Sequence, residues 1–102
     1  MTVLQKFEWT WPPGVKPISF IEWIESLPND EKQECLDGMA RQHSMRQQAI
    51  DRGDMVITDN GYIWKDEETA KRGKGIDEVW EKYWRRWQKE TQATFSMTYE
   101  ET

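Results

Sequence analysis

Cysteine and histidine are almost missing from this sequence of 102 residues, which has one of each, Cys35 and His43. A single cysteine excludes an intrachain disulfide and a cysteine-based metal site. The two residues are eight positions apart on one predicted helix, about 12 Å along its axis, so they cannot pair there as nucleophile and base. The HExxH, GxSxG, GxGxxG and P-loop patterns are also absent from the sequence. We therefore predict no enzymatic activity, no cofactor and no metal site.

Long apolar runs are missing as well, and no stretch of 18 residues has the character of a membrane span. The first twenty residues lack the apolar core and the small-residue cleavage site of a signal peptide. Together with the single cysteine, these features predict a cytoplasmic protein with no membrane partner. The formal charge of −5 argues against nucleic acid as the main partner, because phosphate binding relies on clustered Lys and Arg.

Aliphatic residues are few, but aromatic residues are abundant. The apolar fraction is 36%, and the chain has seven tryptophans, three tyrosines and three phenylalanines. Each buried aromatic side chain removes about 150–250 Å² from water, so a few of them build a sufficient core. The length fits one globular domain over residues 1–102. Its polar end, residues 100–102, is expected to be disordered.

Hydrophobic periodicity predicts the order β-α-α-β-β-α-β. Residues 3–11 alternate, which places Phe7, Trp9 and Trp11 on one face of an N-terminal strand. Residues 55–65 are predicted to form a hairpin that turns at Asn60-Gly61, because Asn-Gly supplies two positive-φ positions. The predicted helices cover residues 19–27, 30–52 and 76–91, and the last strand covers 93–99. Without regular helical crossovers between strands, we expect an α+β fold with a small antiparallel sheet and about three helices.

Two predicted helices have stripes that suggest how they pack. The long helix presents Leu36, Met39, Ala40, His43, Gln47 and Ile50 on one face. The last helix follows the i, i+3, i+4, i+7 rule closely, so Ile76, Trp80 and Trp84 are expected to be buried against the N-terminal strand. A capping box of Ser19 and Glu22 is expected to start the first helix.

Basic residues are concentrated in one part of the acidic chain. Residues 65–89 carry eight basic and six acidic residues, a local charge of +2. Four of these cations form a candidate basic patch on the last helix: Lys82, Arg85, Arg86 and Lys89. Such a patch fits an acidic protein or single-stranded RNA, although the tryptophans of the helix are needed for the core. The preceding segment 71–75, KRGKG, is either a phosphate cradle at a helix start or, as we prefer, a mobile surface loop.

The leading functional hypothesis is a non-enzymatic protein-binding or structural accessory protein that acts through aromatic side chains. Interfaces are enriched in aromatic residues, and the candidate interface residues are Trp9, Trp11, Trp64 and Trp87. The partner is expected to be another protein or a second copy of the chain. Two alternatives stay open: a nucleic-acid-associated protein that uses the basic patch, and a small-molecule binding protein with a Trp-lined pocket.

In size, acidity and tryptophan content the chain resembles small proteins encoded by tailed bacteriophages. This resemblance is one of composition and not of any motif. It implies a virus-encoded accessory protein that acts in the cytoplasm of a bacterial host.

Overall fold

A computed structural model describes residues 1–101 and shows the predicted α+β fold, with a four-stranded antiparallel sheet and four helices in that part of the chain. In chain order the elements are β1 (Val3–Thr10), α1 (Phe20–Glu25), α2 (Asn29–Asp51), β2 (Met55–Thr58), β3 (Gly61–Trp64), α3 (Glu67–Arg72), α4 (Glu78–Thr91) and β4 (Thr94–Glu101). The polar end belongs to β4 as far as Glu101, and residue 102 lies outside the described residues. Within those residues, no helix is long and apolar enough to cross a membrane.

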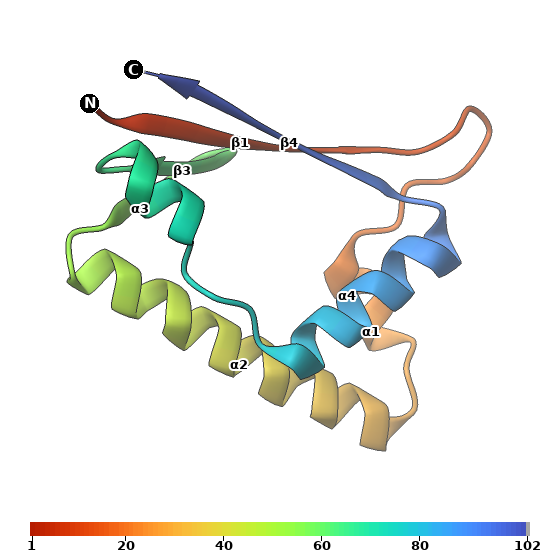
Figure 1. The fold of residues 1–102 in the computed structure, drawn as a ribbon. Helices are drawn as coiled ribbons and strands as arrows, with labels where there is room; N and C mark the ends of the chain where they lie inside the picture. The colour runs from red at the N-terminus through yellow and green to blue at the C-terminus, as the bar shows by residue number, and fades with distance from the viewer. Residues whose placement is uncertain (102) are drawn as a thin grey trace.

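The sheet has the strand order β2-β3-β1-β4, so β1 is flanked by β3 and β4. The register pairs Phe7 with Met97 of β4, and Gln5 with both Tyr62 of β3 and Tyr99 of β4. Because paired residues share a face, the aromatic residues Phe7, Tyr62 and Tyr99 of the three strands point to the same side, whereas Leu4 and Ile63 pair on the opposite side. Figure 1 shows that all four helices lie on one side of the sheet.

The hairpin of β2 and β3 is confirmed, but its turn differs from the predicted one. Thr58 pairs with Gly61, so the turn residues are Asp59 and Asn60, and neither has a positive φ. Gly61 is instead the first residue of β3, where an added Cβ would overlap the main-chain carbonyl of Gln5. The glycine is therefore required by the close approach of two strands, and the prediction of a positive-φ turn was wrong.

Side-chain caps define how three of the helices start. The Ser19 hydroxyl accepts a hydrogen bond from the backbone N–H of Glu22 at 3.1 Å, which confirms Ser19 as the N-cap of α1. The Glu22 carboxylate accepts from the Ser19 hydroxyl at 3.2 Å, in place of the backbone N–H that a capping box uses. Asp66 caps α3 and Asp77 caps α4 in the same way. The long helix α2 begins at Asn29 after Pro28 and has no side-chain cap, which corrects the predicted start at residue 30.

The buried face of α2 also differs from the predicted stripe. Its buried residues are Cys35, Gly38, Gln42 and Ala49, whereas Leu36 is 39% exposed. The physical reason is the crossing with α4 at Gly38, where an added Cβ would lie 2.9 Å from the backbone nitrogen of Trp80. Large side chains of α4 occupy the space between the helices, so α2 contributes its small residues to the contact.

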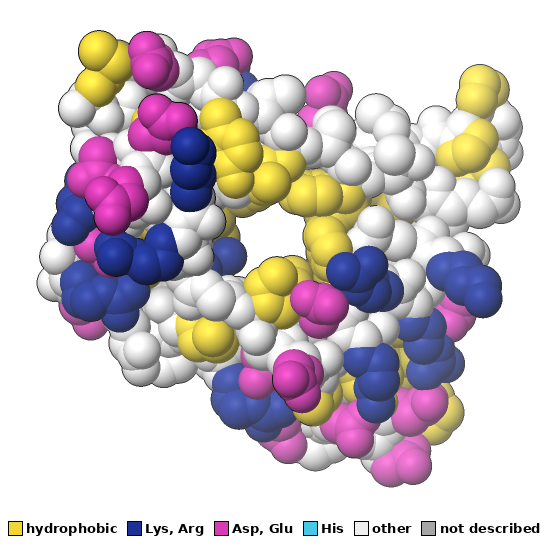
Figure 2. All heavy atoms as spheres, viewed as in Figure 1, with side chains coloured by type: hydrophobic (Ala, Val, Ile, Leu, Met, Phe, Trp, Pro, Cys, Tyr) yellow, Lys and Arg dark blue, Asp and Glu magenta, His cyan; other side chains and the backbone are white. Residues whose placement is uncertain are grey.

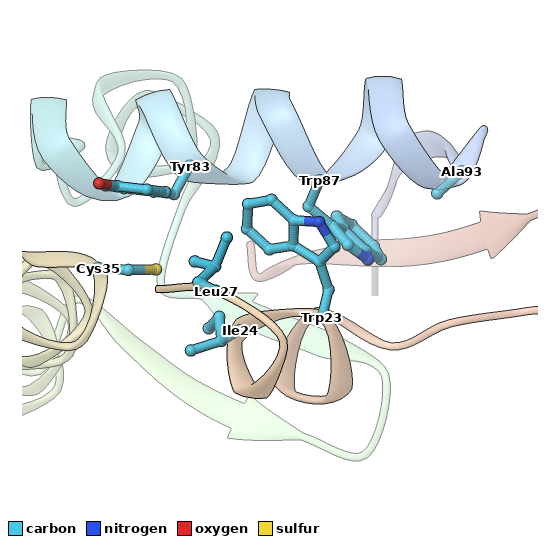
Figure 3. Close-up of a cluster of buried hydrophobic side chains, with 7 residues drawn as sticks. All are labelled: Trp23, Ile24, Leu27, Cys35, Tyr83, Trp87 and Ala93. Atoms are coloured by element: carbon cyan, nitrogen blue, oxygen red, sulfur yellow. The ribbon is translucent and has the colours of Figure 1, made fainter. Parts of the chain in front are cut away.

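The buried core is divided into two clusters. The first cluster lies between α1, α2 and α4 (Figure 3) and consists of Trp23, Ile24, Leu27, Cys35, Tyr83, Trp87 and Ala93. The second cluster lies where α3 and the end of α2 meet the sheet and consists of Val3, Ala49, Met55, Trp64 and Ala70. No cluster of buried hydrophobic residues joins the two across the middle of the sheet within residues 1–101.

The N-terminal strand packs on the last helix through Trp84 and Trp87, but the predicted burial of Ile76, Trp80 and Trp84 is not complete. Trp9 contacts Trp84 and Trp87 with ring centroids 5.6 and 4.7 Å apart, in edge-to-face geometry. Trp80 and Trp84 are half-buried, but Ile76 is 54% exposed. Ile76 was predicted to be buried; it precedes the Asp77 cap of α4 and belongs to the connecting loop.

Candidate ligand site between the sheet and the helices

An opening runs between the two core clusters, from one side of the molecule to the other. Figure 2 shows this passage, with hydrophobic side chains along most of its rim. Two cavities of about 560 and 400 Å³ adjoin each other here, because Lys74 and Trp80 line both of them. We therefore treat the two cavities as one site, the central opening. A volume of several hundred Å³ is typical of pockets for small ligands.

Side chains of the sheet form an aromatic floor for the central opening. Phe7 contacts Tyr62 edge-to-face at 5.0 Å between centroids and stacks on Phe95 at 5.6 Å. Met97 and Tyr99 continue this surface along β4, where they are 42% and 49% exposed. The floor is the helix-facing side of the sheet at the place where no helix covers it.

The helices supply the opposite walls. From α4, Trp80 and Trp84 line the larger cavity and stack on each other at 5.2 Å, with 19° between the ring planes. Met39, His43 and Arg46 of α2 line the smaller cavity. Both α4 rings are half-buried, so each retains surface that faces the opening.

The loop between α3 and α4 closes one side of the opening. Two glycines with positive φ, Gly73 at 70° and Gly75 at 84°, let this loop turn sharply. The buried side chain of Gln42 fixes the loop to α2, because its amide donates to the carbonyl of Gly75 at 3.3 Å and its oxygen accepts from the N–H of Asp77 at 2.7 Å. Of the segment 71–75, which we predicted to be a mobile loop, residues 71 and 72 belong to α3, and Gly75 is held by Gln42.

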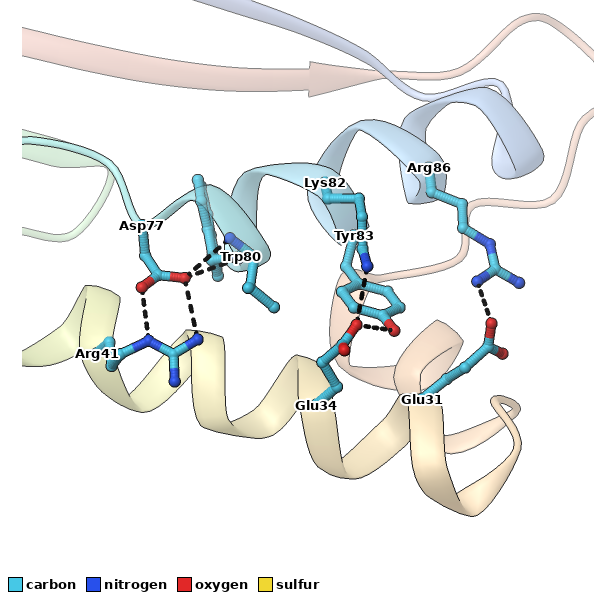
Figure 4. A network of polar contacts seen from close by, with 9 residues as sticks. Glu31, Glu34, Arg41, Asp77, Trp80, Lys82, Tyr83 and Arg86 are labelled. Carbon is cyan, nitrogen blue, oxygen red and sulfur yellow. Dashed lines mark hydrogen bonds and ion pairs between the residues drawn. The ribbon is translucent and has the colours of Figure 1, made fainter.

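The N-terminus of α4 does not provide a phosphate cradle. The Asp77 carboxylate accepts hydrogen bonds from the N–H groups of Val79 and Trp80 at 3.1 and 3.0 Å. It also pairs with Arg41 of α2 at 2.7 Å (Figure 4). The hydrogen bond from Arg41, followed by that from Trp80, holds the pKa of Asp77 below its usual value. An internal carboxylate thus occupies the anion position of this helix end.

The charged residues of the central opening are all basic. Arg46, Lys71, Arg72 and Lys74 line its two cavities, and no Asp or Glu does. Lys71 pairs with Glu67 at 3.1 Å, but no ion pair involves Arg46, Arg72 or Lys74 within the part of the chain that is described. The lack of acidic partners for these three cations is unusual in a chain with 19 acidic and 14 basic residues.

Arg46 and Lys74 are the two half-buried cations of the opening, whereas Lys71 and Arg72 are exposed. Lys74 Nζ lies 5.1 Å from the centroid of the Tyr62 ring, and burial, followed by the charge of Arg46, lowers its pKa. Arg46 donates toward His43 Nδ1 at 2.6 Å, but its buried Nε has no hydrogen-bond partner among the described atoms. A buried donor without a partner costs free energy. The site therefore combines two neighbouring positive charges that lack a counter-ion, which an anion in the opening would supply.

The predicted basic patch on α4 has different surroundings. Its ion pairs join Lys82 to Glu34 at 2.8 Å, Arg85 to Glu81 at 3.2 Å, and Arg86 to Glu31 and Glu90 at 2.9 and 2.6 Å. Figure 4 shows that Glu31 and Glu34 reach the patch from α2. The Lys82 hydrogen bond lowers the pKa of Glu34, and burial raises the pKa of Tyr83 to about 12. Lys89 is the only patch residue without an ion pair in the described structure.

The four predicted interface tryptophans do not form one surface. Trp64 and Trp87 are each 2% exposed, and their ring nitrogens donate to Gln5 Oε1 at 2.8 Å and to the carbonyl of Ile18 at 2.9 Å. Trp9 and Trp11 are half-buried and pack against Trp87 in the first cluster, whereas Trp64 lies in the second. Only Trp9 and Trp11 retain substantial accessible surface in this structure.

Cys35 and His43 lie in different surroundings and do not form a catalytic pair. Cys35 is fully buried in the first cluster, and burial raises the pKa of its thiol to about 11. His43 is exposed at the rim of the smaller cavity. Among residues 1–101 there is no group of three or more His, Cys, Asp or Glu side chains that could hold a metal ion.

Sequence reasoning identified the segment 71–75 but missed the rest of the central opening. Phe7, Trp80 and Trp84 were assigned to the core, and Arg46 was not singled out. The one available signal was the cluster of Lys71, Arg72 and Lys74 between glycines.

The central opening has to be interpreted from its own geometry. Comparisons of the chain with protein-family models, with curated proteins and with solved structures found no significant match.

Proposed function

We propose that this chain is a non-enzymatic binding protein whose ligand occupies the central opening and is an aromatic anion. The observation that carries this proposal is the coincidence of unpaired cations and accessible aromatic rings around one opening that contains no carboxylate. It corresponds to the second of the two alternatives drawn from the sequence, a small-molecule binding protein with a Trp-lined pocket.

The energetics favour a ligand with both features. Hydrogen bonds to charged groups contribute about 1.5–3 kcal/mol each. Burial of the apolar part of the ligand against the aromatic rings contributes about 25 cal/mol per Å² of apolar surface removed from water. Ordering the ligand offsets much of this gain. An affinity on the order of 10–100 µM is therefore expected.

Binding of another polypeptide, the function preferred from the sequence, is the second candidate. Its support is the edge strand β2, where Val56 and Ile57 are 55% and 53% exposed. An exposed strand edge with apolar side chains is a common site of strand pairing between chains. The basic patch on α4 gives less support to nucleic-acid binding, because acidic residues neutralise most of its charge.

The test of the proposal uses a matched pair of ligands in isothermal titration calorimetry. Indole-3-acetate and indole-3-acetamide share one ring and differ in charge. We expect the anion to bind at least ten times more tightly, and to lose this advantage in a protein with Arg46→Met and Lys74→Met. Arg85→Met removes a remote cation and should leave binding unchanged. Equal binding of the two ligands, or no binding of either at millimolar concentration, would contradict the proposal.

A further inference from the structure

The central opening offers more positive charge than a single carboxylate needs. Arg46, Arg72 and Lys74 are unpaired within the described residues, and Lys71 is close to them in the chain. Three of these four cations belong to one wall, the end of α3 and the loop after it. A compact group with two negative charges, such as a phosphate monoester, matches this arrangement better than a carboxylate does.

The aromatic part of the opening lies beside these cations and presents rings at different angles: Phe7 and Tyr62 meet edge-to-face, whereas Trp80 and Trp84 stack on each other. Trp80 lines both cavities, Phe7 lines the larger one and Tyr62 the smaller one. Successive rings on the floor are about one ring apart, with 5.0 Å between the centroids of Phe7 and Tyr62. Rings in such numbers are typical of proteins that stack nucleobases. The larger cavity, about 560 Å³, also has room for a base, a sugar and a phosphate together.

The two amide side chains that line the opening, those of Gln5 and Gln42, are already engaged. Gln5 accepts from the ring nitrogen of Trp64 at 2.8 Å and donates to the Tyr99 hydroxyl at 3.2 Å. Gln42 holds the loop before α4 through two hydrogen bonds. With both amides committed, recognition depends on the ring and the phosphate and not on the identity of the base.

We propose that the ligand of the central opening is a nucleoside monophosphate, an inference that rests on the proposed function. Its base lies among the aromatic rings, and its phosphate lies at Lys74 and Arg46. The site discriminates little between bases. The net charge of −5 repels a long polyanion, which favours a free nucleotide over a nucleotide unit within a strand.

The experiment is a calorimetric titration of the full chain with adenosine monophosphate, uridine monophosphate, adenosine, ribose 5-phosphate and octathymidylate. Adenosine and uridine monophosphates should bind within a factor of ten of each other. Adenosine and ribose 5-phosphate should bind at least ten times more weakly than adenosine monophosphate, because each lacks one half of the recognised group. Lys74→Met and Arg46→Met should each weaken binding of adenosine monophosphate about tenfold, while Arg85→Met should not change it. Circular dichroism would verify that each variant is folded.

The outcomes separate this inference from the proposed function. Binding of indole-3-acetate without binding of adenosine monophosphate would overturn the nucleotide assignment and leave the aromatic-anion site in place. If neither indole-3-acetate nor adenosine monophosphate binds, both proposals are overturned. A difference of more than tenfold between adenosine and uridine monophosphates would contradict recognition without base reading. If octathymidylate binds more than ten times tighter than the mononucleotides, with the same dependence on Lys74, the assignment of a free nucleotide is overturned and the ligand is a nucleotide strand.

Discussion

The first cluster and the central opening contain the same kinds of side chains in different surroundings. In and around the first cluster, Trp87 is buried and Arg86 pairs with carboxylates of α2 and α4. In the central opening, Trp80 is half-buried and Lys74 has no ion pair within residues 1–101. In the first region, other residues of the chain bury the ring and pair with the cation. In the second region, the ring stays partly accessible and the cation lacks an ion pair.

This difference teaches how a binding site can be recognised without a motif. Aromatic residues and basic residues are common in both regions, so their presence alone says nothing about function. What distinguishes the opening is the lack of a covering helix above the rings and the lack of an ion pair, within the described residues, at three of its four cations. A fold that leaves such groups unsatisfied loses free energy that a ligand can restore.

Removal of one tryptophan from each region gives the largest expected contrast. Trp87→Ala should lower the free energy of unfolding by about 3–5 kcal/mol, because it empties a fully packed site. Trp80→Ala loses mainly a stacked pair with Trp84 and should cost no more than about 2 kcal/mol. Urea denaturation of both variants measures the difference. Equal losses would show that Trp80 belongs to the core and would remove the distinction between the regions.

Gly38→Ala tests the contact that holds α4 beside α2. Alanine normally stabilises a helix interior relative to glycine. Here the new Cβ would lie 2.9 Å from the backbone nitrogen of Trp80 and 3.2 Å from Asp77 Oδ1, so we expect a loss of about 1–3 kcal/mol. Thermal unfolding followed by circular dichroism measures it, with Ser44→Ala on the exposed side of α2 as the control. A stabilised Gly38→Ala protein would mean that the two helices are farther apart.

Acid should weaken the contact between α2 and α4. Hydrogen bonds from Arg41 and Lys82 hold the pKa values of Asp77 and Glu34 below 3.8 and 4.5. A carboxyl with a lowered pKa in the folded state stabilises the protein above its unfolded pKa, and this contribution is lost as the pH falls through the lowered value. The free energy of unfolding should therefore be steady above about pH 5 and fall below about pH 4.5.

The matched variant for this pH dependence is Asp77→Asn. It should be less stable than the original protein at neutral pH and lose less stability in acid, as measured by urea denaturation across the pH range. An unchanged pH profile would show that the pair of Asp77 and Arg41 does not act as the structure indicates.

Removal of one cation from each region has the smallest expected effect on the free energy of unfolding, and the two variants should differ in the direction of the change. Arg86→Gln loses two partly exposed ion pairs and should cost at most about 1 kcal/mol. Lys74→Met removes a charge without a counter-ion, so its stability should be unchanged or slightly higher. The measurement is urea denaturation of both variants at low salt. A Lys74→Met protein less stable than Arg86→Gln would contradict the assignment of Lys74 as an unsatisfied group.

Local sequence patterns were sufficient to predict most elements of the fold. Alternation along residues 3–11, the Ser19 cap and the segment around Asn60-Gly61 correctly indicated a strand, a helix start and a hairpin. These features depend on neighbours in the chain, which the sequence contains directly. The role of Gly61 was misjudged because it depends on β1, more than 50 residues away in the sequence.

The candidate site was less predictable for the same reason. The acids that neutralise Lys82 and Arg86 come from α2, and the ring beside Lys74 comes from β3. Whether a cation has an acidic partner depends on which helix packs beside it. This packing was not predicted, because the weak apolar stripe of α2 indicated the wrong buried face. The sequence therefore emphasised the basic patch on α4, where the charges are neutralised, over the segment 71–75, where most are not.

The most direct test of the central opening as a ligand site is a ¹H–¹⁵N NMR titration of the seven tryptophan indole signals with indole-3-acetate. We predict shifts for Trp80 and Trp84, which line the opening. The signals of Trp23 and Trp87 should stay in place, because their ring nitrogens are hydrogen-bonded to Glu90 and Ile18 away from it. Shifts confined to Trp9 and Trp11, or no shift at saturating ligand, would contradict the account.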